Sequence, residues 1–85
     1  MVTRELTSPL EAHYELKCTK ALNPQLPSIL KKVVEDSLKT GQILKVIVRF
    51  PNCGDFVRAW MQEHGHKFIG KFSEYEHLEF YFEIV

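Results

Sequence analysis

Apolar and polar residues alternate with a period of two over residues 14–18 and again over residues 77–84. At positions 14–18, charged residues separate Tyr14, Leu16 and Cys18, which predicts a half-buried strand. Near the C-terminus two sets of alternating residues face opposite ways. The apolar set is Leu78, Phe80, Phe82 and Ile84, and the other set is His77, Glu79, Tyr81 and Glu83. This pattern predicts a second strand whose two faces differ in character.

A helical period follows the first strand. Its apolar face consists of Leu26, Ile29, Leu30, Val33, Val34 and Leu38. Asn23 is the predicted N-cap, because its side chain can accept a backbone hydrogen bond, and Pro24 suits the first helical position. Gly41 is predicted to end this helix.

A second helix is predicted between Pro51 and Gly65, with Asn52 or Asp55 as its cap. Its apolar face consists of Phe56, Val57, Trp60 and Met61. We predict that Trp60 and all six phenylalanines belong to the core, and that Tyr75 is exposed in a hairpin over residues 73–76.

Residues 43–50 are rich in β-branched side chains and almost continuously apolar, which is typical of a central strand in a parallel pair. Residues 67–72 form a further predicted strand. The order is β-α-β-α-β-β, an α+β fold in which two helices cover one face of a four-stranded mixed sheet. We expect one domain over residues 11–85, preceded by a flexible lead-in over residues 1–10.

The two parallel strands end at the same edge of the predicted sheet. Cys18, Asn23 and the Pro51–Asp55 segment should therefore lie together on one rim. Open α/β sheets commonly place their ligand sites at such a rim.

Composition narrows the function classes. The 85 residues include eleven basic and eleven acidic side chains, so the formal charge is zero, which argues against nucleic-acid binding. We expect no membrane span and no secretion signal, and therefore a reducing, cytoplasmic location with free thiols. His64 and His66 flank a glycine at a helix end, a poor metal-site pattern, so we expect neither a metal nor a cofactor.

Each cysteine has two interpretations. Cys18 is either a buried residue at the end of a strand or a reactive thiol near Lys17 and Lys20. Cys53 lies in a turn that opens the second helix, where backbone N–H groups and the helix dipole favour a thiolate. The alternative is that Cys53 is an inert loop cysteine.

Over residues 13–85 the chain resembles the TusA/SirA-like family of small sulfur carriers. The family's first helix opens on Cys-Pro-x-Pro, and here the matching segment is Asn23-Pro24-Gln25-Leu26-Pro27. A glycine turn, Thr40-Gly41-Gln42, then leads into the apolar strand over residues 43–48 at the family's spacing. Asn23 stands where the family has its persulfide-carrying cysteine, and the second proline is displaced by one position.

The resemblance implies a sulfur relay, with sulfur-donor and sulfur-acceptor proteins as partners and no substrate pocket of its own. Cys53 is then the first candidate for the carrier thiol and Cys18 the second. The alternative is a non-catalytic binding or regulatory module that has lost the carrier cysteine. In both cases the chain is expected to be a monomer. The expected partner or ligand contacts are Asn23, Pro24, Pro27, Asn52 and Asp55.

Overall fold

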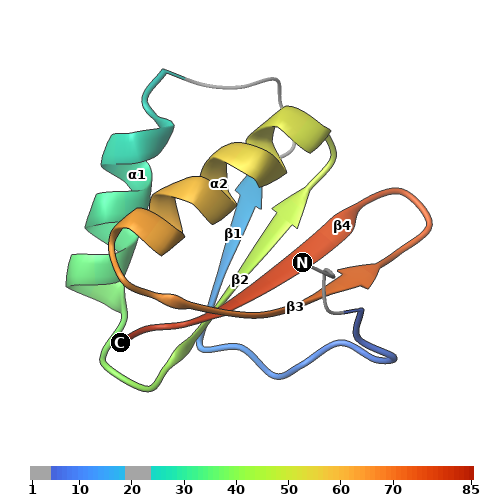
Figure 1. The fold of residues 1–85 in the computed structure, drawn as a ribbon, viewed down its shortest axis with the longest axis horizontal. Coiled ribbons are helices and arrows are strands. Elements are labelled where there is room, and N and C mark those ends of the chain that lie inside the picture. The colour runs from blue at the N-terminus through green and yellow to red at the C-terminus, as the bar shows by residue number, and fades with distance from the viewer. Residues whose placement is uncertain (1–4, 19–23) are drawn as a thin grey trace.

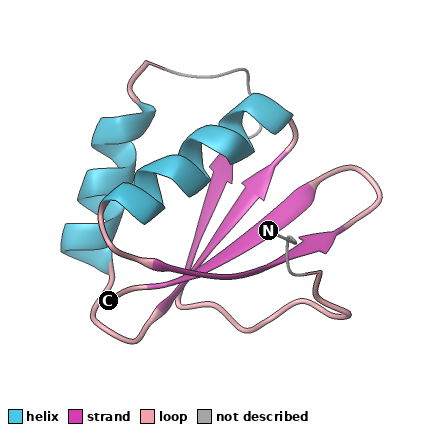
Figure 2. Ribbon diagram, in the orientation of Figure 1, coloured by secondary structure: helices cyan, strands magenta, loops and turns pink. Residues whose placement is uncertain are grey.

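The computed structural model describes residues 5–18 and 24–85. Their elements follow the predicted order, and two helices cover one face of a four-stranded mixed sheet, which confirms the α+β class (Figures 1 and 2). The elements are β1 (Tyr14–Cys18), α1 (Leu26–Lys32), the π-helical turn η1 (Val33–Ser37), β2 (Ile43–Val48), α2 (Pro51–Glu63), β3 (Lys67–Ser73) and β4 (Leu78–Glu83).

The sheet has the strand order β1-β2-β4-β3. β1 and β2 are parallel, and β4 runs antiparallel to both β2 and β3. β2 therefore has a paired neighbour on each side, as its nearly continuous apolar sequence predicted. A register shift between Phe68 and Gly70 interrupts the pairing of β3 with β4.

α1 is shorter than predicted at both ends. Its α-helical part begins at Leu26, with Pro27 in the first turn and Gln25 as the N-cap; the predicted cap, Asn23, lies outside the described residues. The helical path ends with η1, and Leu38 is already extended, so the prediction that Gly41 ends the helix is wrong. Leu38 is buried from this extended backbone, so its apolar side chain reaches the core without a further helical turn.

α2 begins directly at Pro51, and Phe50 is its N-cap in an extended conformation. Asn52 and Asp55 lie inside the helix, so the prediction that one of them is the N-cap is wrong. Among the residues that the structure describes, no side chain caps this end. Proline suits the first helical position because its φ is already helical and it has no N–H that needs a partner. At the other end Gly65 has a φ of +80°, as expected of a glycine that ends a helix.

The segment that precedes β1 pairs with the outer edge of β3 at Glu5 and Leu6, and at Leu10 it reaches the face of the sheet away from the helices. The Leu6 N–H donates to the Lys71 carbonyl over 2.7 Å, and the Leu10 backbone hydrogen bonds to the Tyr81 hydroxyl. Figure 1 shows this segment on the side of the sheet away from both helices. The described part of the predicted lead-in, residues 5–10, thus contacts β3 and β4.

The core lies between the helices and the sheet. Its buried side chains include Leu30, Leu44, Val46, Val48, Val57, Met61, Phe80 and Phe82. The prediction that every phenylalanine belongs to the core is wrong for Phe50, which is 44% exposed, and for Phe72, which is half-buried and lies outside the core cluster. Within the described residues, no helix has the length and apolar character needed to cross a membrane.

Candidate functional site

The parallel pairing of β1 and β2 brings their ends to one edge of the sheet, as predicted. Cys18 pairs with Val48, and the Arg49 N–H donates to the Cys18 carbonyl over 3.3 Å. The first residue of β4, Leu78, pairs with Val48 from the other side, so the β3–β4 loop reaches the same edge. We call this edge the rim: Cys18, residues 49–55 and the loop residues 74–77; in Figure 1 the turn from β2 into α2 is near the top and the β3–β4 loop is at the right.

Both thiols lie beneath the surface of the rim. Cys53 is in the first turn of α2 and is 2% exposed, and Cys18 is 8% exposed. Burial raises the pKa of the Cys18 thiol, and the nearby Cys53 raises it further. Cys18 is therefore held in its neutral, unreactive form at pH 7. Both side chains belong to the core cluster.

The other predicted contact residues are at the surface. Pro24, Pro27, Asn52 and Asp55 are exposed, and Asn23 lies outside the described residues. Asn52 and Asp55 belong to the rim through the first turns of α2, whereas Pro24 and Pro27 flank the start of α1. The rim therefore presents polar side chains above its buried thiols.

Two exposed aromatic residues also belong to the rim. Tyr75 is 97% exposed, which confirms its predicted place at the tip of the hairpin, and Phe50 is 44% exposed. Phe50 leaves the core because the chain turns from β2 into α2 immediately after it. The signal in the sequence is Pro51, which starts a helix and thereby ends the strand alternation. An ion pair between Arg49 and Glu76, 3.3 Å from Nη2 to Oε2, links the two segments that carry these aromatic residues.

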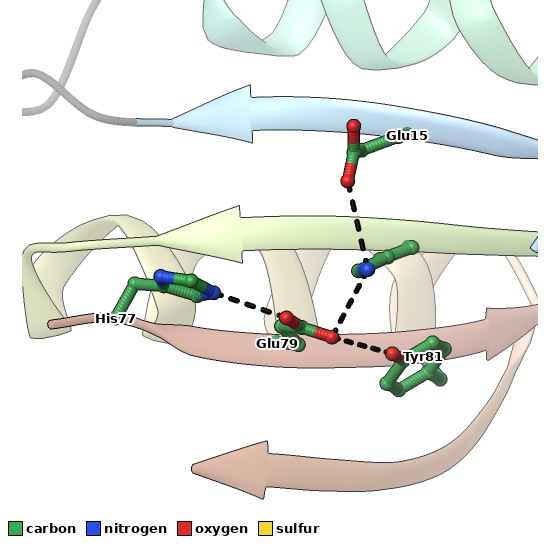
Figure 3. Close-up of polar contacts among 5 residues, drawn as sticks. Glu15, His77, Glu79 and Tyr81 are labelled. Atoms are coloured by element: carbon green, nitrogen blue, oxygen red, sulfur yellow. Dashed lines mark hydrogen bonds and ion pairs between the residues drawn. The ribbon is translucent and has the colours of Figure 1, made fainter. Parts of the chain in front are cut away.

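A second cluster of polar groups lies on the face of the sheet away from the helices (Figure 3). At its centre is Glu79, which is 5% exposed. Its Oε1 accepts a hydrogen bond from the Tyr81 hydroxyl at 2.5 Å and lies 3.2 Å from Lys45 Nζ. Its Oε2 lies 3.0 Å from His77 Nε2. Lys45 Nζ also reaches Glu15 Oε1 at 3.5 Å, so the cluster links β1, β2 and β4.

The hydrogen-bond donors around Glu79 determine whether its side chain is ionised. Burial alone would raise the pKa of Glu79, but the hydrogen bonds from Tyr81, His77 and Lys45 outweigh burial and hold the pKa below its ordinary value. Burial, followed by the hydrogen bond to the Glu79 carboxylate, raises the pKa of Tyr81 above its ordinary value. At pH 7 the pair is thus a carboxylate and a neutral phenol. Because both carboxylate oxygens already have donors, this arrangement holds strands together and leaves Glu79 poorly placed for acid–base chemistry.

The sequence placed His77, Glu79 and Tyr81 on one strand face, and their contacts confirm it. It did not indicate that this face is buried. The available signal is the pair of leucines, Leu6 and Leu10, in the segment before the first strand, since apolar side chains there need a surface to cover.

The β-α-β-α-β-β order predicted from the sequence is present, and an element order of this kind by itself specifies neither a family nor an activity. Comparisons with models of known protein families, with curated proteins and with solved structures give no match for this chain.

Proposed function

We propose that this domain is a non-catalytic binding module that docks a protein partner through the rim. The observation that carries the proposal is the position of Phe50 and Tyr75. Among the described residues, the large apolar side chains that are exposed are Phe50, Tyr75 and Val85, and two of these three belong to the rim. Exposed aromatic side chains gathered at one edge are typical of protein interfaces.

The ion pair between Arg49 and Glu76 supports this role. Both side chains are more than half exposed, so the pair adds little to the stability of the fold. It does link the end of β2 to the β3–β4 loop, which restricts the relative positions of Phe50 and Tyr75. A surface that is ordered before binding loses less entropy when a partner docks.

The shape of the rim favours a protein over a small molecule as the partner. Small ligands are bound in concave sites that enclose most of their surface. Tyr75, at 97% exposure, projects from a loop and cannot enclose a ligand. A projecting tyrosine instead fits a pocket on the partner, with Arg49 and Glu76 as polar contacts beside it. Aromatic residues and arginine are the side chains that most often dominate binding energy at interfaces.

The test uses the intact chain with a photo-reactive benzoylphenylalanine in place of Tyr75, and a matched chain with the same group in place of Glu63, an exposed residue at the far end of α2. Irradiation in cells should give a defined cross-linked protein from position 75 and not from position 63. The cross-linked protein is identified by mass spectrometry and purified.

Binding of the purified partner is then measured by calorimetry. Tyr75→Ala and Phe50→Ser should each weaken binding by about tenfold or more, the usual loss for a central aromatic contact. Glu63→Ala should leave the affinity unchanged. Equal affinities for wild type, Tyr75→Ala and Phe50→Ser would overturn the proposal, as would equally strong cross-linking from position 63.

A sulfur relay is the second candidate, and it is favoured by one observation. Cys53 occupies the first turn of α2 directly beneath the rim, next to Cys18. The relay would require the rim to open, because Cys53 is 2% exposed. Incubation with a cysteine desulfurase and cysteine, followed by intact mass spectrometry, tests it. A gain of one sulfur that is lost only in Cys53→Ser or only in Cys18→Ser would establish a carrier, and no gain supports the binding module.

A further inference from the structure

A cavity of about 280 Å³ lies between the C-terminal half of α2 and the strands β3 and β4. It is at the opposite end of β4 from the rim, because Phe82 lies near the end of that strand and Leu78 begins it. Three polar side chains, Arg58, Gln62 and His66, line the cavity together with the rings of Phe68 and Phe82. An apolar wall with a few polar groups is the usual composition of a small-molecule site.

Arg58 supplies a positive charge to this cavity. Its guanidinium carbon is 4.3 Å from the centre of the Phe68 ring, which orients the group without neutralising it. Within residues 5–18 and 24–85, the ion pairs are formed by other side chains, and no carboxylate pairs with Arg58. Gln62 follows Arg58 by one helical turn, so both side chains lie on the same face of α2.

His66 adds a hydrogen-bond donor. The Val85 N–H donates to His66 Nδ1 over 3.2 Å, so Nδ1 is an acceptor and the proton of the neutral ring is on Nε2. Burial, followed by the nearby His64, lowers the pKa of His66, which keeps the ring neutral at pH 7. The tautomer is fixed by the backbone, and Nε2–H is free to donate.

We propose that this cavity binds a small organic anion, with its carboxylate on Arg58 and its apolar body against Phe68 and Phe82. Gln62 and His66 supply further donors to the carboxylate. The cavity volume is just below the usual range for ligand sites, so it suits only a compact ligand with a single ring. Arginine matches this ligand class because its planar group can donate two parallel hydrogen bonds to one carboxylate. The site is separate from the rim and does not depend on the function proposed for the rim.

The test is a titration of the ¹⁵N-labelled intact chain with phenylacetate, followed by ¹H–¹⁵N correlation spectra at pH 7. Phenylacetamide, which has nearly the same shape and no charge, is the matched ligand. We expect saturable shifts of the amides of Arg58, Gln62, His66 and Val85, with a dissociation constant on the order of 1 mM for so small a ligand. Phenylacetamide should bind about tenfold more weakly or worse.

Substitutions of positively charged residues test which side chain binds the carboxylate of phenylacetate. Arg58→Gln should weaken phenylacetate binding by about tenfold, while Arg58→Lys, which keeps the charge and loses the fork, should be intermediate. Lys31→Gln removes a positive charge from the exposed face of α1 and should bind as wild type. The proposal is overturned if phenylacetate gives no saturable shifts, if phenylacetamide binds equally well, or if Lys31→Gln loses as much affinity as Arg58→Gln. Dispersed spectra for each variant show that it is folded.

Discussion

Glu79 is a buried carboxylate that stays ionised because three neighbouring groups donate to it. Tyr81, His77 and Lys45 occupy both of its oxygens, and within the described residues no buried polar side-chain atom lacks a hydrogen-bond partner. A buried charge with a complete set of donors is tolerated, whereas a donor that loses its acceptor is left desolvated and unsatisfied. The cluster is therefore stable only while every donor keeps its acceptor, and removing one partner should cost free energy of unfolding.

Glu79→Gln keeps the size of the side chain and removes its charge. The amide oxygen of glutamine cannot accept all of the hydrogen bonds that the Glu79 carboxylate accepts. The amide N–H groups would also face the hydrogen-bond donors of Tyr81, His77 and Lys45. We expect a loss of about 1–3 kcal/mol in the free energy of unfolding, measured with urea at pH 7. Glu74→Gln, at an exposed loop position, is the control and should change stability by less than about 0.5 kcal/mol. A Glu79→Gln chain as stable as wild type would show that the cluster contributes nothing.

The same carboxylate predicts a pH dependence. The pKa of Glu79 is lower in the folded state, so below the ordinary glutamate value of about 4.3 the unfolded chain binds more protons than the folded one. The stabilisation is complete above that pH and is lost as the pH falls through the folded pKa. Urea midpoints measured between about pH 5 and pH 3 should fall more steeply for wild type than for Glu79→Gln. Parallel curves for the two chains would contradict this assignment.

At the scale of elements, α2 shows what sequence patterns can and cannot locate. The helical spacing of apolar residues predicted which face of α2 is buried, and Gly65 predicted where the helix ends, because both signals are local in the sequence. Its start was misplaced, since Asn52 and Asp55 are good caps by type while Pro51 begins the helix without one. The sequence also could not show that Gly54 lies against Phe80, because that contact joins distant segments.

Gly54 lets α2 approach the sheet closely. A Cβ at this position would lie 2.8 Å from Phe80 Cε2 and 3.1 Å from Cζ, and the Phe80 ring is itself buried. Gly54→Ala should therefore destabilise the fold by about 1–3 kcal/mol, although alanine is the better helix former. Urea unfolding compares it with Asn52→Ala, an exposed substitution in the same helix that should change stability by less than about 0.5 kcal/mol. Stabilisation by Gly54→Ala would mean that the helix and sheet are less closely packed.

The segment before β1 makes specific contacts with the sheet. The Leu6 N–H is bonded to the Lys71 carbonyl at 2.7 Å, whereas the Ser8 N–H has no such bond among the described contacts. We expect the Leu6 amide to exchange with deuterium about tenfold or more slowly than the Ser8 amide after correction for intrinsic rates. Equal and rapid exchange at both positions would instead agree with the flexible lead-in expected from the sequence.

At the scale of the whole molecule, the fold class could be predicted because each element carries its own period and parallel strands must be joined by a crossover. The rim could be predicted for the same reason: parallel strands end at one edge, and Cys18 and Cys53 do lie together there. The burial of both thiols and the exposure of Phe50 could not be predicted from the sequence, because they depend on how α2 packs onto the sheet. Cysteine and phenylalanine occur in cores and in sites alike.

The proposal of a binding module places its aromatic contacts at the surface of the rim and its thiols in the core. The most direct test is alkylation of the native chain with iodoacetamide at pH 7, followed by intact mass spectrometry, with glutathione as the free-thiol reference. Both Cys18 and Cys53 should react more than about 100-fold more slowly than glutathione, and both should react fully in urea. A native Cys53 that is alkylated as fast as glutathione would contradict the proposal and favour a thiol-based function.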